Sequence, residues 1–117
     1  MKSDTYSIEI EQGSTFDLML KWKSESRTPI NLDGSSARMH IRRTTNSSET
    51  VLALDSRQSD SLSIFGSLGR IDIRIEATDT SLIPDGIYVY DLEVELKDGT
   101  VKKLLKGRCR VLGEVTR

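Results

Sequence analysis

The chain has 117 residues, of which 36% are hydrophobic and 30% are charged, and its 17 basic and 18 acidic side chains give a formal charge of −1. This size fits one domain, predicted over residues 1–117, and the near-zero charge argues against nucleic acid or an anionic membrane as a partner. One Cys and one His exclude an internal disulfide and a Cys-based zinc site, and they are too few for most His-based metal sites.

The first half of the chain alternates apolar and polar residues with the period of two that is typical of strands. Gly13 separates the first two alternating runs, and polar stretches over 24–28 and 43–50 predict loops. The strands predicted in this half cover residues 5–11, 15–23, 37–42, 50–55 and 61–65.

The second half continues the strand pattern and contains no helical period of useful length. A polar cluster over 77–83 predicts a turn or one short helical turn, and Asp98-Gly99 predicts a tight hairpin. The strands predicted here cover 70–76, 88–97 and 101–112, the last with Leu105, Gly107, Cys109 and Val111 facing inward. Together the runs predict an all-β fold, an immunoglobulin-like antiparallel β-sandwich of about seven to eight strands.

Aromatic residues on the apolar stripes are expected to form the structural core. The predicted core residues are Trp22, Tyr88, Tyr90 and Leu92. Asp85-Gly86-Ile87-Tyr88 also has the pattern of a tyrosine corner, in which a Tyr at a strand start bonds to upstream backbone.

Charged residues occupy the polar faces of three strands that an immunoglobulin-like order makes neighbours. Asp91, Glu93 and Glu95 are expected between two basic strands. One basic strand carries Arg38, His40 and Arg42, and the other carries Lys106, Arg108 and Arg110. Such a ladder stabilises strand register, and a role in binding a partner is the alternative.

The residues indicate no chemistry of an enzyme. His40 lies between two Arg neighbours of its face, no Gly-x-Ser-x-Gly turn is present, and Cys109 is expected to be a buried thiol. No metal loop or phosphate loop is found, and the basic cluster of Arg38, Arg42 and Arg43 lacks interleaved aromatics. We therefore expect no catalytic, cofactor or metal site.

No apolar run approaches the ~20 residues of a membrane span. The N-terminal residues have no apolar segment, so they are not expected to be a signal peptide. The domain is expected to be soluble and made in a reducing compartment.

Several motifs in order resemble a bacteriophage β-sandwich family found in upper-baseplate N-terminal domains and long-tail-fibre connector proteins. They cover nearly the whole chain except residues 44–65, where the sequence departs from the family. The motifs are Ile10-Glu11-Gln12-Gly13-Ser14-Thr15-Phe16 followed by Leu18 to Trp22-Lys23, Thr28-Pro29-Ile30-Asn31-Leu32-Asp33-Gly34 leading to Ala37-Arg38-Met39-His40-Ile41-Arg42, Ala77-Thr78-Asp79-Thr80, Ile83-Pro84-Asp85-Gly86-Ile87-Tyr88-Val89-Tyr90-Asp91-Leu92-Glu93, Asp98-Gly99-Thr100-Val101, Leu105-Lys106-Gly107 and the terminal Gly113-Glu114-Val115-Thr116-Arg117.

The resemblance implies a non-enzymatic virion structural protein, an adaptor at the tail, baseplate or tail-fibre junction. It would be assembled in the host bacterial cytoplasm, bind other virion proteins, need no cofactor and be present in multiple copies. Strand edges and termini suit docking, and the residues expected to dock partners are Tyr6, Ile8, Ile10, Glu114, Val115 and Arg117. A capsid-decorating protein, a head–tail neck protein and a host-glycan-binding module remain alternatives, although the last usually shows exposed aromatic platforms.

Overall fold

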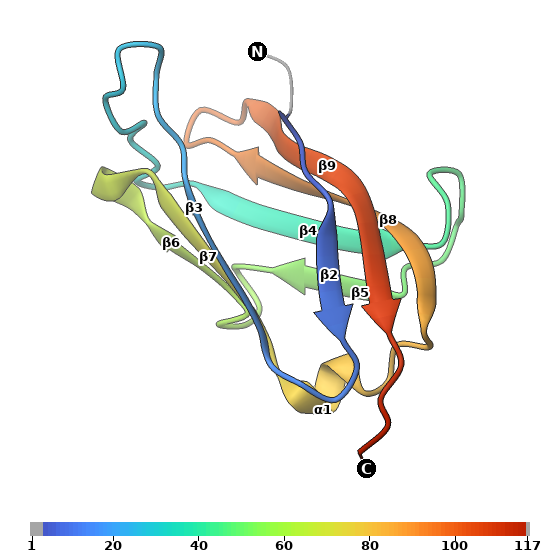
Figure 1. Ribbon diagram of the computed structural model, residues 1–117. Coiled ribbons are helices and arrows are strands. Elements are labelled where there is room, and N and C mark those ends of the chain that lie inside the picture. Colours follow the sequence, from blue (N-terminus) through green and yellow to red (C-terminus); the bar gives the residue numbers. More distant parts are fainter. Residues whose placement is uncertain (1–3, 117) are drawn as a thin grey trace.

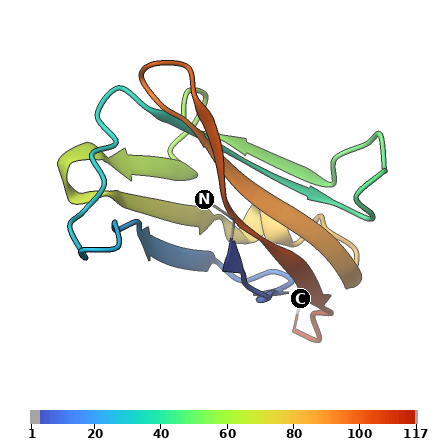
Figure 2. The ribbon, with the colours of Figure 1, turned by 90° about the horizontal axis from the view of Figure 1, so that it is seen from above.

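Two β-sheets packed face to face make up the computed structural model, which describes residues 4–116 (Figures 1 and 2). The all-β, immunoglobulin-like sandwich is as predicted. Among these residues the helices are one α-helical turn, α1 (Ala77–Thr80), and a 3-10 turn (Gly66–Leu68), so none could span a membrane. The strands are β1 (Asp4–Thr5), β2 (Ile8–Glu11), β3 (Phe16–Lys21), β4 (Ser36–Arg42), β5 (Leu52–Asp55), β6 (Leu62–Phe65), β7 (Arg70–Ile75), β8 (Gly86–Glu95) and β9 (Val101–Leu112).

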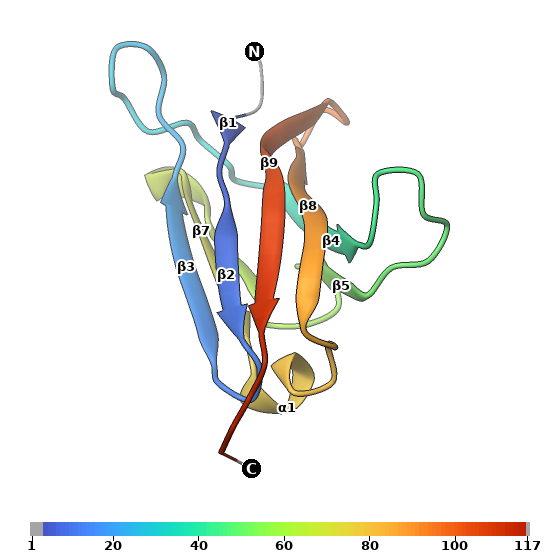
Figure 3. The same ribbon diagram turned by 45° about the vertical axis from the view of Figure 1, so that its right-hand side comes forward.

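Sheet A has the strand order β1-β9-β8-β4-β5, with β2 also pairing with β9, and sheet B has the order β3-β7-β6. The structure has nine strands rather than seven to eight because the N-terminal run is split into β1 and β2. Both pieces run parallel to β9, whereas every other strand pair is antiparallel (Figure 3). The sandwich is therefore antiparallel, as predicted, except that β1 and β2 pair with β9 in parallel, which was not predicted.

The core lies between the sheets, and the period-two stripes fill it. Tyr88, Tyr90 and Leu92 of β8 are at most 4% exposed, as predicted for the longest stripe. Trp22 follows the last residue of β3 and packs against this core while remaining partly exposed. One apolar core therefore holds both sheets together.

The predicted tyrosine corner is present at the start of β8. The Tyr88 hydroxyl donates a hydrogen bond of 2.5 Å to the Pro84 carbonyl oxygen. This bond fixes the segment that connects α1 to β8, and it satisfies a hydroxyl that is otherwise buried in the core.

A second tyrosine holds the N-terminal segment where β1 gives way to β2. The Tyr90 hydroxyl donates to the Tyr6 carbonyl oxygen (2.6 Å), and the Tyr6 N–H donates to the Lys106 carbonyl oxygen (2.8 Å). Gly107 makes this approach possible, because a Cβ at that position would lie 2.3 Å from the Tyr6 oxygen. The close passage of the N-terminal segment thus requires a glycine in β9.

A β-bulge interrupts the pairing of β8 with β9. Leu92 lies opposite Leu105, whereas the next residue, Glu93, lies opposite Lys103. Leu104 is the extra residue, and both Leu104 and Leu105 are buried. The bulge changes the phase of β9, so that Lys103 and Lys106 both lie on the outer face of sheet A.

The end of the sandwich near the C-terminus is joined by side-chain hydrogen bonds. Thr80 of α1 is fully buried; its hydroxyl accepts from the Gly13 N–H (3.1 Å) and donates to the Ser14 carbonyl (2.8 Å). Gln12 donates to the Ile83 carbonyl and accepts from the Glu114 N–H, each at 3.0 Å. The turn between β2 and β3, the α1 turn and the C-terminal segment are thereby held as one unit.

Candidate functional site

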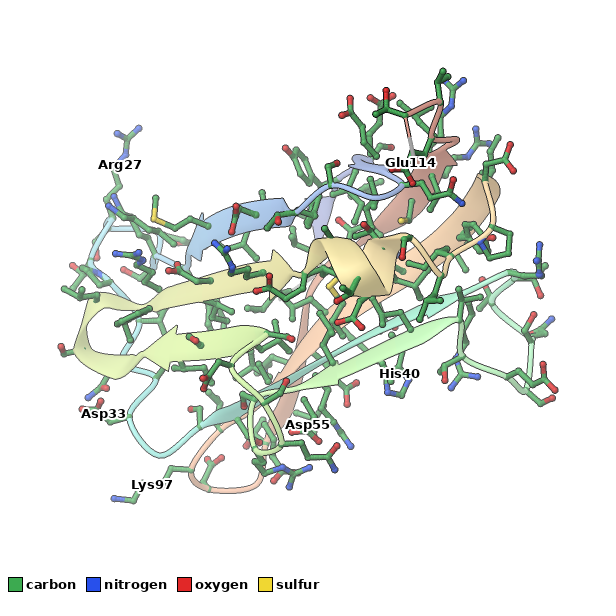
Figure 4. The ribbon with its side chains drawn as sticks, turned by 90° about the horizontal axis from the view of Figure 1, so that it is seen from below. Arg27, Asp33, His40, Asp55, Lys97 and Glu114 are labelled. Carbon is green, nitrogen blue, oxygen red and sulfur yellow. The ribbon has the colours of Figure 1, made fainter. Side chains whose placement is uncertain are left out.

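The outer face of sheet A carries an open groove of about 710 Å³, which we call the charged face. Figure 4 shows His40 pointing from this face away from the sandwich. The groove crosses β9, β8 and β4 and reaches the N-terminal segment on one side and the β4–β5 loop on the other. Its lining residues are Thr5, Ser7, Arg38, His40, Arg42, Thr45, Val89, Tyr90, Asp91, Glu93, Lys103, Lys106, Gly107 and Arg108.

Glu93 is the centre of the ion-pair network on this face. Its carboxylate binds Arg38 of β4 on one side and Lys103 of β9 on the other, and Lys103 also lies 3.2 Å from Asp91. The hydrogen bond from Lys103, followed by the nearby charges of Lys103 and Arg38, lowers the pKa of Glu93 below its ordinary value. The same contact raises the pKa of Lys103, so both groups stay charged at neutral pH.

Basic residues surround this centre and dominate the charge of the face. The groove is lined by five Arg or Lys residues and two acidic residues, which leaves 12 basic and 16 acidic side chains elsewhere in the chain. Within residues 4–116, neither Lys106 nor Arg108 forms an ion pair. The charged face is therefore locally positive on a chain that is slightly acidic overall, and two of its cations can bind a partner without breaking an internal ion pair.

The predicted charge ladder forms in part. Arg38 lies opposite Glu93 and His40 lies opposite Asp91, as expected. On the other side, Lys106 lies opposite Asp91, but the ion pairs are made by Lys103. The predicted order of the three strands is present, but other charged residues of these strands lie opposite uncharged ones. Glu95 lies opposite Ser36 and Val101, while Arg110 lies opposite Ile87. The reason is the register. The acidic residues of β8 begin at Asp91, which lies opposite Lys106, so the basic residues of β9 beyond Lys106 lie opposite uncharged residues.

The charged face presents charged and hydrogen-bonding side chains. The Nδ1 atom of His40 lies 3.4 Å from the Nη2 atom of Arg42, and among residues 4–116 no hydrogen bond joins His40 to Asp91, the carboxylate opposite it. Arg42 also donates to the Ser47 carbonyl (2.8 Å) and so fixes the β4–β5 loop beside the groove. Cys109 is buried under the sheet, where burial raises the pKa of its thiol to about 11. Among residues 4–116, no three His, Cys, Asp or Glu residues are grouped as a metal site requires.

The residues expected to dock partners are placed differently by the structure. The side chains of Ile8 and Ile10 are at most 4% exposed because they face the core from β2, so a partner at these positions would contact the backbone of this strand. Tyr6 is 49% exposed and Val115 is 92% exposed. Glu114 is partly buried at the end of the sandwich near the C-terminus, where its N–H donates to Gln12, and Arg117 lies outside the described residues.

The groove itself was not anticipated from the sequence. Its charged residues were expected on one face, but Thr5 and Ser7 join it only because the N-terminal segment runs parallel beside β9. Lys103 lines the groove because the bulge turns its side chain to the outer face. Two adjacent leucines, Leu104 and Leu105, inside an alternating strand are the sequence signal that could have indicated the bulge.

No family model matches the chain, and no curated protein matches it. Among solved structures, the chain is similar to the soluble domain of PmoD from Methylocystis sp. ATCC 49242 (Rockwell), with a TM-score of 0.49 and 12% identity. That similarity covers 91% of this chain and 79% of the other. At this level of likeness nothing about function follows.

Proposed function

We propose that this protein is a non-enzymatic adaptor of a bacteriophage virion, at the tail, baseplate or tail-fibre junction, and that it binds a neighbouring virion protein on the charged face. The observation that carries this proposal is the open, locally positive groove over β4, β8 and β9. Ion pairs inside the groove stabilise it without a partner, while Lys106 and Arg108 remain available for one.

The shape and charge of the face favour a protein surface as the partner. Charges of both signs, with Glu93 between Arg38 and Lys103, define an orientation as well as an attraction, and such complementarity gives specificity and a fast encounter. A partner with an acidic patch fits the positive balance, and its contribution would weaken with added salt.

The resemblance to the phage family supports the proposal from a second direction. Several of its motifs supply the hydrogen bonds at the end of the sandwich near the C-terminus, including those of the Gly13 turn, Thr80 and the Pro84–Tyr88 corner. Residues 44–65, where the sequence differs from the family, contain β5 and β6 and begin at the margin of the groove, at Thr45. The shared motifs therefore supply both the scaffold and much of the lining of the groove, and the stretch that differs from the family touches the groove at Thr45.

The experiment is to detect and place the protein in purified phage particles by mass spectrometry and immunogold microscopy. Label at the tail, baseplate or fibre junction supports the proposal, and absence from particles contradicts it. Label on the capsid or neck contradicts the tail location and favours one of those alternatives.

A charge-reversal pair tests the face itself. The double variant Lys106→Glu/Arg108→Glu is expected to incorporate into particles at least about tenfold less than wild type, because two cations become anions at the contact. The control Lys23→Glu/Lys97→Glu makes the same change of charge on exposed residues outside the groove and should incorporate normally. Equal incorporation of both double variants would contradict docking on the charged face.

A further inference from the structure

The free edge of β3 has the features of a surface for strand pairing. β3 is an end strand of sheet B, because the N-terminal strands pair with β9 in sheet A instead of extending sheet B. A groove of about 470 Å³ lies beside β3 and is lined by Asp4, Thr5, Tyr6, Leu18, Met19, Leu20 and Leu105. The inward residues of β3, among them Leu18 and Leu20, remain partly exposed, whereas those of β7 are buried.

Within residues 4–116, no backbone hydrogen bond uses the groups that β3 directs at this edge. Trp22 N–H donates to the Gly69 carbonyl (2.7 Å) in the same register that pairs Leu20 with Ile71. The N–H and C=O groups of successive residues point to opposite sides of a strand. Leu18 and Leu20 therefore direct their N–H and C=O groups at β7. Asp17, Met19 and Lys21 direct their N–H and C=O groups at the free edge.

We propose that a second copy of this chain pairs with this edge, β3 antiparallel to β3, about a two-fold axis at Met19. In that register Asp17 lies opposite Lys21 of the second copy, Met19 lies opposite Met19, and Lys21 lies opposite Asp17. Both ion pairs form on the outer side, and Leu18 meets Leu20 of the second copy on the inner side. The segment is thus complementary to itself, as a two-fold interface requires.

Other registers are less favourable. A shift of two residues in either direction places Met19 opposite a charged residue, Asp17 or Lys21. The two-fold register also covers Met19, which is 53% exposed, with an apolar side chain. The pairing would join two three-stranded sheets into one of six strands, and it leaves the charged face of each copy open.

Charge swaps give the decisive test by sedimentation velocity and light scattering. Asp17→Lys alone places lysines opposite each other, and Lys21→Asp alone does so with aspartates, so each is expected to weaken self-association roughly tenfold or more. Mixing the two variants restores both ion pairs, so a heterodimer is expected to form preferentially. Glu25→Lys, which makes the same charge change on an exposed loop, should dimerise as wild type does.

A backbone variant separates strand pairing from charge. Met19→Pro removes an N–H that β7 does not use, so the fold should persist by circular dichroism while dimerisation is lost. A wild-type protein that stays monomeric up to about 1 mM would overturn the proposal. Unchanged dimerisation of folded Met19→Pro, or no preference for the heterodimer on mixing, would overturn it equally.

Discussion

Two buried tyrosines on β8, only two residues apart, form hydrogen bonds to different parts of the chain. Tyr88 bonds to the Pro84 carbonyl and closes the corner before its own strand, whereas Tyr90 bonds to the Tyr6 carbonyl across 84 residues of sequence. The first bond is local and follows from a recognisable motif. The second depends on where the N-terminal segment runs, so no local pattern predicts it.

Tyr88→Phe is expected to destabilise the fold by about 0.5–1.5 kcal/mol, because it removes the hydrogen bond between the Tyr88 hydroxyl and the Pro84 carbonyl oxygen. For a chain of this size the midpoint of thermal unfolding should fall by several degrees. Chemical denaturation checks the value, with Tyr6→Phe as the control because that ring is 49% exposed. An unchanged midpoint for Tyr88→Phe would show that the corner bond does not stabilise the fold.

Gly107→Ala is expected to cost about 1–3 kcal/mol, the usual range for overpacking a filled site. The new Cβ would lie 2.3 Å from the Tyr6 oxygen and push the N-terminal segment off β9. Gly113→Ala is the matched control, since its Cβ would lie no nearer than 3.7 Å to other atoms. Equal stability of the two variants contradicts the close passage described here.

At the level of elements, three strands of sheet A share one ion-pair network. β8 supplies the acidic residues, while β4 and β9 supply the cations on its two sides. Exposed pairs of this kind contribute roughly 0.2–1 kcal/mol each, so the network chiefly fixes strand register and the shape of the groove.

Glu93→Gln should therefore destabilise the fold by roughly 1 kcal/mol at pH 7 and by much less at pH 3. The pKa of Glu93 is lowered in the folded state, so its contribution is complete above the ordinary glutamate pKa of about 4.3. The contribution is lost as pH falls through the folded-state pKa. Urea denaturation at both pH values measures the difference, with exposed Glu49→Gln as the control. A destabilisation that does not change with pH would contradict this account of Glu93.

Period two predicted the strands, the inward stripes and the corner because each of these depends on neighbouring residues. The short helical turn at 77–80 was also within the expected range, since its polar cluster ends a strand. The parallel placement of β1 and β2, the bulge at Leu104 and the groove were not predicted. The parallel placement and the groove depend on residues far apart in sequence, such as Tyr6 with Gly107, and alternation carries no information on that pairing. The bulge did leave a local signal, the adjacent residues Leu104 and Leu105 in an otherwise alternating strand.

The whole molecule has a single core to which both sheets contribute, so it should unfold in one cooperative step. Trp22 is the single tryptophan and packs beside sheet B, whereas circular dichroism reports on all strands. The fluorescence and dichroism transitions are expected to coincide in urea. Separate midpoints would mean that sheet B unfolds independently of sheet A.

Charge is distributed unevenly over this molecule despite its near-zero sum. The positive groove on sheet A is balanced by acidic residues elsewhere, and it shares only Thr5 with the groove beside the β3 edge. The two surfaces would allow a pair of copies to present two charged faces at once, which raises the strength of attachment to a symmetric particle.

The most direct measurement is site-specific photo-crosslinking inside assembled phage particles. A photoreactive residue replaces Arg108 on the charged face in one sample and Arg74 on the outer face of sheet B in another. We predict crosslinks from position 108 to a different virion protein, and few from position 74. Crosslinking from position 74 that equals or exceeds that from position 108, or absence of the protein from particles, would contradict the account.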